Sequence, residues 1–142
     1  MSLNKLYDAL ENETNVSIMD QTTRKIKDQK NNILQKLQLD RKQLKEFHKK
    51  LKGYRYCSDL RDIQYGYYIR WIPINKGSII KLTNGGHLCD VIIINNTIHV
   101  RCRNNFGGLM QLKFDENIIF QKISSQEKVI LSVLDYLETD HN

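Results

Sequence analysis

The chain has no long apolar segment and few cysteines. Its longest apolar run, 91–94, has the length of a strand, so no membrane-spanning helix is expected. The first residues lack a charged start followed by an apolar core, so no secretory signal is expected either. The three cysteines, Cys57, Cys89 and Cys102, are odd in number and not clustered, which argues against a disulfide framework. We therefore expect reduced thiols in a protein that is not secreted.

Motifs for catalysis and metal binding are also missing. The P-loop, GxSxG, GxGxxG, C-x-x-C and HExxH patterns do not occur. His87 and Cys89 share one face of a predicted strand, but His99 and Cys102 fall on opposite faces of theirs, so four ligands do not converge. We expect no enzyme, no cofactor, no metal site and no small-molecule substrate. A nuclease-like or nucleotide-acting barrel is the less favoured alternative.

Positive charge is abundant and unevenly distributed. The net charge is +6, and residues 24–52 carry eleven Lys or Arg against three acidic residues. Residues 124–142 carry one basic residue against four acidic ones. A basic segment of this kind favours a nucleic acid or an acidic protein surface as partner, and an ordinary solvated helix surface is an equally open interpretation.

Residues 1–15 are predicted to form a short helix or a flexible arm, and residues 16–53 one long basic helix that stops at Gly53. Apolar residues of this helix recur at heptad spacing, interrupted by Lys30 and Asp40, which makes it a candidate coiled coil. Such a helix could pair with a second copy, fold back as a hairpin, or pack on the following domain. The favoured expectation is a homodimer, with these residues at its seam: Ile26, Ile33, Leu37, Leu44, Phe47 and Leu51.

Residues 54–142 are predicted to form a small β-barrel domain with a C-terminal helix. Turn residues such as Asn84-Gly85-Gly86 and Asn95-Asn96 separate five strand-like segments. These segments are 67–74, 78–82, 87–95, 97–103 and 109–122. An antiparallel meander of five bent strands favours an SH3-like or Tudor-like barrel, with an OB-like barrel as the alternative.

The last helix has its own start signal. Ser124 and Glu127 are spaced as a capping box ahead of apolar residues at helical spacing. The predicted fold class is therefore α+β: an N-terminal long helix, a five-stranded antiparallel barrel and a C-terminal helix.

One face of the predicted strand 97–103 is cationic, because basic residues alternate with apolar ones. Lys and Arg side chains neutralise phosphates without reading base sequence, so this row is a candidate nucleic-acid surface together with the basic helix. A solvated outer face is the alternative. The candidate residues are Arg70, Lys81, His99, Arg101, Arg103 and Lys113 on the barrel, with Lys42, Lys45 and Lys49 on the helix.

A set of aromatic residues is a second candidate site. A Tudor-like barrel could arrange Tyr65, Tyr67, Trp71 and Phe106 into a cage for a methylated cation or a platform for stacked bases. The alternative is that these rings form the core of a small barrel. Phe106 stands out because Asn105 and Gly107 flank it in a predicted turn.

Residues 54–137 resemble a family of known proteins. The most specific stretches are DLRDI followed by GYYIRWI, and FQK followed by ILSVLDYL near the end. They are similar to small proteins of nucleocytoplasmic large DNA viruses of the mimivirus and marseillevirus type. The resemblance implies a viral protein, carried in the virion and acting in the cytoplasm or nucleus of the host cell. It implies no activity and transfers no functional residue.

Together these observations favour a non-enzymatic binding or assembly protein, dimeric through its helix, with a basic surface for nucleic acid or an acidic partner. The alternative is an adaptor that recruits a host chromatin or transcription protein through a Tudor-like aromatic face.

Overall fold

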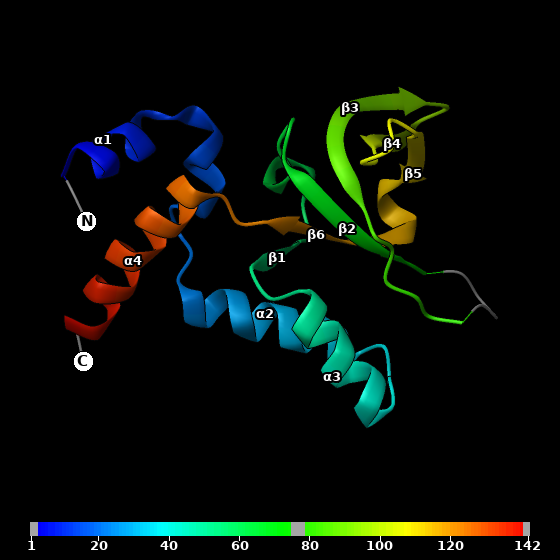
Figure 1. Cartoon of the computed structure of the whole chain (residues 1–142), viewed down its shortest axis with the longest axis horizontal. Helices are drawn as coiled ribbons and strands as arrows, with labels where there is room; N and C mark the ends of the chain where they lie inside the picture. The colour runs from blue at the N-terminus through cyan, green and yellow to red at the C-terminus, as the bar shows by residue number, and fades with distance from the viewer. Residues whose placement is uncertain (1–2, 75–78, 141–142) are drawn as a thin grey trace. The chain divides into compact units, whose positions relative to one another are not determined.

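The structure, a computed structural model, describes residues 3–74 and 79–140 and has an α+β fold (Figure 1). The helices are α1 (Leu3–Glu11), α2 (Thr23–Gln35), α3 (Arg41–Lys50) and α4 (Ser125–Asp140). The strands are β1 (Tyr54–Cys57), β2 (Tyr68–Pro73), β3 (Gly86–Ile94), β4 (Thr97–Arg103), β5 (Leu109–Lys113) and β6 (Asn117–Lys122). Three short 3₁₀ helices, η1 (Glu13–Ile18), η2 (Leu60–Asp62) and η3 (Phe114–Glu116), complete the described elements.

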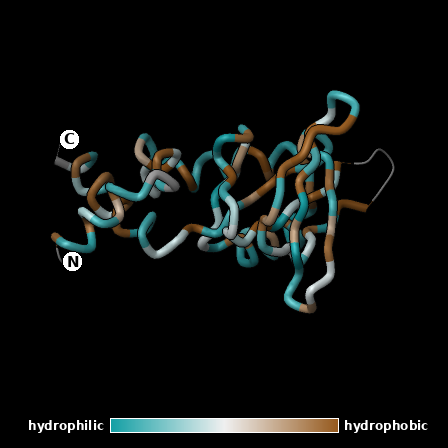
Figure 2. The backbone as a smooth tube through the Cα atoms, turned by 90° about the horizontal axis from the view of Figure 1, so that it is seen from above, coloured by the Kyte–Doolittle hydropathy of each residue, from teal (hydrophilic) through white to brown (hydrophobic). Residues whose placement is uncertain are grey.

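The chain divides into two compact units. Unit 1 contains residues 1–55 and 123–142, and unit 2 contains residues 56–122. In both units hydrophobic and hydrophilic stretches alternate along the chain (Figure 2). Each unit therefore has its own apolar residues to bury, and each is described separately below.

Unit 1 is helical, and α4 packs against both α1 and α2. One apolar cluster contains Ala9, Ile18, Ile26, Ile130 and Leu131. The predicted capping box at the start of α4 is confirmed. The Ser124 hydroxyl accepts a hydrogen bond from the Glu127 amide at 3.1 Å, and the Glu127 carboxylate accepts one from the Ser124 amide at 2.9 Å.

The prediction of one long N-terminal helix is wrong. The first helix of the chain, α1, is short, and the predicted long helix is two helices, α2 and α3, joined at residues 36–40. Gln38 adopts a left-handed conformation, with φ at 54°. Asp40 then caps α3, because its carboxylate accepts a hydrogen bond from the Gln43 amide at 2.7 Å. A heptad pattern cannot distinguish an N-cap aspartate from a polar residue inside a continuous seam.

The residues predicted to form the dimer seam are buried or half-buried within the single chain. Ile26, Phe47 and Leu51 are buried, at 4%, 4% and 0% exposure. The other three, Ile33, Leu37 and Leu44, are half-buried. The continuous apolar stripe on which the dimer was predicted is therefore absent, since it required one unbroken helix.

The six strands form one open antiparallel sheet in the order β1-β6-β2-β3-β4-β5. Strands β2 to β5 follow one another as a meander, and β6 returns to pair with β2. Strands β1 and β5 are the two edges. The predicted five-stranded SH3/Tudor-like barrel is therefore wrong in strand number and in closure.

The predicted strands differ from the observed ones at three places. The predicted strand 78–82 is not formed over 79–82, and Ser78 lies outside the described residues. Farther along this connection, Thr83 bonds to β2: its amide donates to the Trp71 carbonyl at 3.0 Å and its hydroxyl accepts from the Trp71 amide at 3.1 Å. The predicted segment 109–122 is two strands separated by η3, and β1 was not predicted.

The β3–β4 turn is confirmed. Asn95 and Asn96 have φ values of 50° and 64°, the positive pair that a two-residue hairpin requires. One face of the sheet in unit 2 then buries a core made of Cys57, Ile63, Ile69, Trp71, Leu88, Val100, Cys102, Leu112 and Ile119.

Over residues 3–74 and 79–140, no helix has both the length and the apolar content needed to cross a bilayer.

Candidate nucleic-acid interface

Basic side chains gather on the face of the sheet opposite this core. Strand register places Tyr68 beside His87, His87 beside Arg103, and His99 beside Lys113. Residues directly opposite one another share a face, and so do residues two apart in a strand. We call this surface the basic face, and it consists of Arg70, His87, His99, Arg101, Arg103 and Lys113.

The same alternation explains why this face is polar. Val100 and Cys102 lie between the basic residues of β4, and both are fully buried. A slip of one residue in the register would bury Arg101 and expose Val100. The core therefore fixes which side chains of β4 project outward.

Arg101 is held in place by its neighbours. Its Nε donates a hydrogen bond to the Gln111 side-chain oxygen at 3.1 Å. The Gln111 amide nitrogen lies 3.1 Å from Nδ1 of His99, which accepts in the tautomer protonated on Nε2. This chain of contacts orders three side chains on the face and leaves the terminal nitrogens of Arg101 available to a phosphate.

Neighbouring acids reduce the charge of the basic face. Asp90 pairs in register with Arg101, although its carboxylate accepts a hydrogen bond from the Val91 amide. Lys113 lies 3.7 Å from Glu116, and both side chains are about half exposed. The basic face is therefore moderately cationic, with Arg101 and Arg103 at its centre.

Arg70 lies at the edge of the basic face. Lys81 is not in a strand, so strand register does not place it on this face. Arg70 Nε donates to the Thr83 carbonyl at 2.8 Å. Lys81 is exposed in the irregular connection between β2 and β3, so its predicted position on a strand is wrong. The six sheet residues predicted for nucleic-acid binding are thus reduced to five on the basic face.

Phe106 lies in the β4–β5 loop and is 98% exposed. The Asn104 side chain braces the loop, because it accepts hydrogen bonds from the amides of Phe106 at 3.0 Å and Gly108 at 2.8 Å. A loop braced in this way, with a whole aromatic ring exposed near Arg103, provides a surface on which a flat group can stack.

The other predicted aromatic residues do not form a cage with Phe106. Trp71 is buried in the core at 6% exposure, so its ring cannot form the wall of an open site. Tyr65 is exposed in the turn before β2, and Tyr67 is half-buried at the end of that turn. The T-shaped contact of Tyr68 and His87, with ring centres 5.0 Å apart, lies on the basic face instead.

The three lysines predicted for nucleic-acid binding on the long helix all lie on one helix of the structure, α3. Lys42, Lys45 and Lys49 are all exposed on α3. Their spacing of three and four residues puts them on one side of the helix. They belong to unit 1, whereas the basic face belongs to unit 2.

Cys102 is a buried free thiol. Burial, and after it the neighbouring Cys89, raises the pKa of the Cys102 thiol to about 12, so this thiol is protonated at neutral pH. Among the described residues, no group of three or more His, Cys, Asp or Glu side chains could hold a metal ion together.

Sequence reasoning did not assign His87 to the basic face, nor Lys27, Lys30, Lys52 and Lys128 to any shared site. His87 was considered only as a metal ligand, although its alternation with the apolar Leu88 indicated that His87 lies on the polar face of the sheet. The four lysines come from segments distant in sequence, so only the folded chain brings them together.

The class that these features define is an α+β protein with an open antiparallel sheet and a cationic sheet face. Comparison with family models, with curated proteins and with solved structures found no match to the chain.

Proposed function

We propose that the protein binds single-stranded nucleic acid through the basic face, and that it acts by binding rather than by catalysis. The observation that carries this proposal is the strand register, which puts Arg101 and Arg103 on one solvent-facing row with His99 and Lys113 beside them. Cationic side chains on a rigid sheet are spaced by the strands, so they can follow a sugar–phosphate backbone without rearrangement.

Arginine favours phosphate as the ligand. A guanidinium group forms two parallel hydrogen bonds to a phosphate and is less strongly hydrated than an ammonium group. Arg101 is already oriented by Gln111, so little side-chain entropy is lost when it binds.

The exposed ring of Phe106 favours single strands over duplex. Bases of a single strand are accessible for stacking on an aromatic side chain, whereas those of a duplex are stacked on one another. Phe106 follows Arg103 by three residues, so a strand whose phosphate contacts Arg103 would have a base within reach of the loop.

The test is fluorescence anisotropy with a labelled oligothymidylate of about twenty nucleotides, a length that exceeds the ~4–16 nucleotides of a typical single-strand site. The log of the affinity should fall with the log of the salt concentration. The basic face has four cations, Arg70, Arg101, Arg103 and Lys113, so with a factor of about 0.7 per phosphate the slope is expected to reach about −3.

The double variant Arg101→Ala/Arg103→Ala should reduce that slope by about 1.4, because two phosphate contacts are lost. The matched control is Arg24→Ala/Arg61→Ala, which removes two exposed arginines away from the basic face. An equal loss in both variants would show that only net charge matters, and it would overturn the proposal. Tighter binding of polyglutamate than of the oligonucleotide would instead assign the face to an acidic protein.

A further inference from the structure

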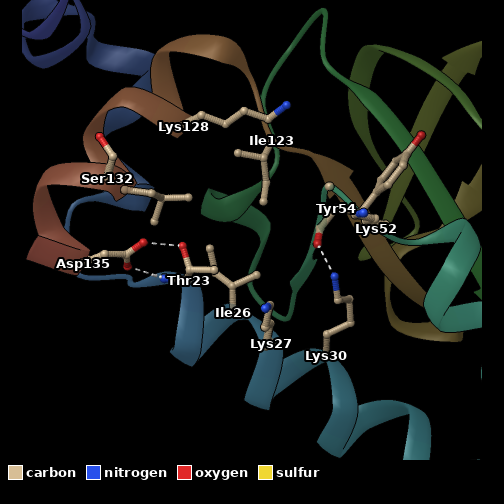
Figure 3. Close-up of a pocket in the computed structure, with 12 residues that line it drawn as sticks. Thr23, Ile26, Lys27, Lys30, Lys52, Tyr54, Ile123, Lys128, Ser132 and Asp135 are labelled. Carbon is tan, nitrogen blue, oxygen red and sulfur yellow. Dashed lines mark hydrogen bonds between the residues drawn. The ribbon is translucent and has the colours of Figure 1, made fainter. Parts of the chain in front are cut away.

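Unit 1 contains a cavity of about 350 Å³ that the function proposed above does not use (Figure 3). It lies among α2, α4 and the segment that connects α3 to β1. Pockets for small ligands in proteins have volumes of about 300–1,000 Å³, so this cavity is large enough for a compact organic molecule.

One side of the cavity is apolar. Ile26 of α2 and Leu131 of α4 line it and are themselves buried at 4% and 5% exposure. Ile123, just before α4, packs on the same cluster and points into the cavity (Figure 3). A ligand with a flat or apolar body would find a preformed surface there.

Four lysines also line the cavity, and they come from three segments. Lys27 and Lys30 come from α2, Lys52 precedes β1, and Lys128 lies on α4 above Ile123 (Figure 3). Lys30 is 8% exposed, and its ammonium donates to the carbonyls of Leu51 and Tyr54, each at 3.0 Å. An ammonium group has three hydrogens, so one more can be donated to a ligand.

Burial and a neighbouring charge both act on Lys30. Burial lowers the pKa of Lys30, and the charge of Lys27 lowers it further. An anion bound between these two lysines would favour the charged form of Lys30 and would so oppose both effects.

The acidic residue that lines the cavity, Asp135, already accepts hydrogen bonds within the protein. Both oxygens of the Asp135 carboxylate accept hydrogen bonds from Thr23, from its amide at 2.8 Å and its hydroxyl at 2.6 Å (Figure 3). This carboxylate therefore neutralises the N-terminus of α2 more than it does the lysines. The cavity retains an excess of positive charge.

We propose that this cavity binds a small organic phosphate, a phosphate monoester with an aromatic or apolar body. The phosphate would lie among Lys27, Lys30 and Lys52, and the body would pack on Ile26, Ile123 and Leu131. Lysine acts as a point charge toward phosphate and tolerates several geometries, so ammonium groups from separate segments can contact one anion.

The probe is AMP, titrated into the full chain by isothermal calorimetry, with inorganic phosphate and adenosine as separate titrations. AMP should bind more tightly than either of its parts, because it uses both the lysines and the apolar side of the cavity. If AMP does not bind, or binds no better than inorganic phosphate, the proposal fails.

Two variants test the location. Lys27→Ala/Lys52→Ala/Lys128→Ala should weaken AMP binding at least about tenfold, a change of ~1.4 kcal/mol. Ser132→Phe, at an exposed position on the cavity wall, should block AMP without a change of charge. The matched control is Lys42→Ala/Lys45→Ala/Lys49→Ala, which removes the same charge from α3 outside the cavity.

Equal weakening by the cavity and control triple variants would show non-specific attraction and would overturn the proposal. Both triple variants retain the basic face of unit 2. Binding of the oligonucleotide to the cavity variant therefore separates failure of this proposal from failure of the proposed function.

Discussion

The ammonium group of Lys30 lies 3.0 Å from the carbonyl oxygen of Leu51 and donates a hydrogen bond to it, so that a side chain of α2 caps the C-terminus of α3. The final carbonyls of a helix have no partner within the helix, and a buried cation satisfies them well. This contact explains why a lysine occupies an otherwise apolar row of the sequence. It is a packing contact between two helices, and it requires that the chain turn between them.

Lys30→Met should destabilise the protein by about 1–3 kcal/mol, because the carbonyls of Leu51 and Tyr54 lose a buried donor. The measurement is urea unfolding followed by circular dichroism. Lys36→Met is the matched control at an exposed position at the end of α2, and a change within about 0.5 kcal/mol is expected there. Equal stability of the two variants would contradict the role given to Lys30.

His48 of α3 should make stability depend on pH. Burial lowers the pKa of His48 below 6.5, and the charge of Lys30 lowers it further. His48 lines a surface hollow, and the other residues around that hollow are Lys27, Asp28, Lys30, Asn31 and Lys52. The unfolded chain therefore takes up a proton at higher pH than the folded one does, so the free energy of unfolding falls as the pH drops below 6.5.

The check is urea unfolding of the wild type and of His48→Gln at several pH values from neutral to acidic. The difference between the two should change below pH 6.5 and be constant above it. An NMR titration of the His48 ring should also show a midpoint below 6.5 that rises in Lys30→Met. A midpoint above 6.5 would contradict the assignment.

Some of this fold could be predicted from the sequence, and the reasons are local. The Asn95-Asn96 turn and the capping box of Ser124 and Glu127 depend on residues next to each other, and both are confirmed. The alternation of β4 likewise gave the polar and buried faces correctly.

Other parts depend on contacts between distant segments. Heptad spacing could not show that Asp40 caps a new helix, since the pattern contains no information on backbone direction. The missing strand at 79–82 and the return of β6 to β2 are set by pairing across the sheet. The lysine cavity has no sequence signature, because its four cations come from three separate segments.

A buried ion pair in unit 1 should matter more than an exposed one. Arg55 and Glu127 are almost fully buried, with 3.6 Å between guanidinium and carboxylate. Glu127→Ala leaves Arg55 buried without this carboxylate and removes half of the capping box, so we expect a loss of about 3–5 kcal/mol. Glu138→Ala breaks the pair with Arg24, whose side chain is 71% exposed, and should cost less than about 1 kcal/mol in the same unfolding assay. Similar losses would contradict the difference in burial.

Two glycines of unit 2 have the same backbone conformation but different surroundings, so their alanine variants can be compared. Gly85 and Gly66 have nearly equal positive φ values, 84° and 83°. A Cβ on Gly85 would lie 2.0 Å from the Ile69 carbonyl oxygen, whereas one on Gly66 would meet nothing within 4 Å. Gly66→Ala should cost only the strain of a left-handed residue, about 1–2 kcal/mol, and Gly85→Ala clearly more. Thermal unfolding measures both, and equal melting temperatures would contradict the close approach of the loop to β2.

Phe106 tests the stacking part of the proposed function without disturbing the fold. The ring is 98% exposed, and the loop is held by Asn104 rather than by the ring, so Phe106→Ala should change stability by less than about 0.5 kcal/mol. If a base stacks on this ring, the affinity for oligothymidylate should fall by about 1–3 kcal/mol. The salt slope should stay the same, because no phosphate contact is removed.

Phe106→Trp is the matched variant, because it retains and enlarges the aromatic surface. It should bind at least as tightly as the wild type in the same anisotropy titration. The Arg101→Ala/Arg103→Ala variant should show the opposite pattern, with a reduced slope and an intact ring. An unchanged affinity for Phe106→Ala would mean that the loop does not contact a base and that the basic face binds phosphates alone. A fall in its salt slope would contradict the assignment of Phe106 to base stacking, because it would show a loss of phosphate contacts.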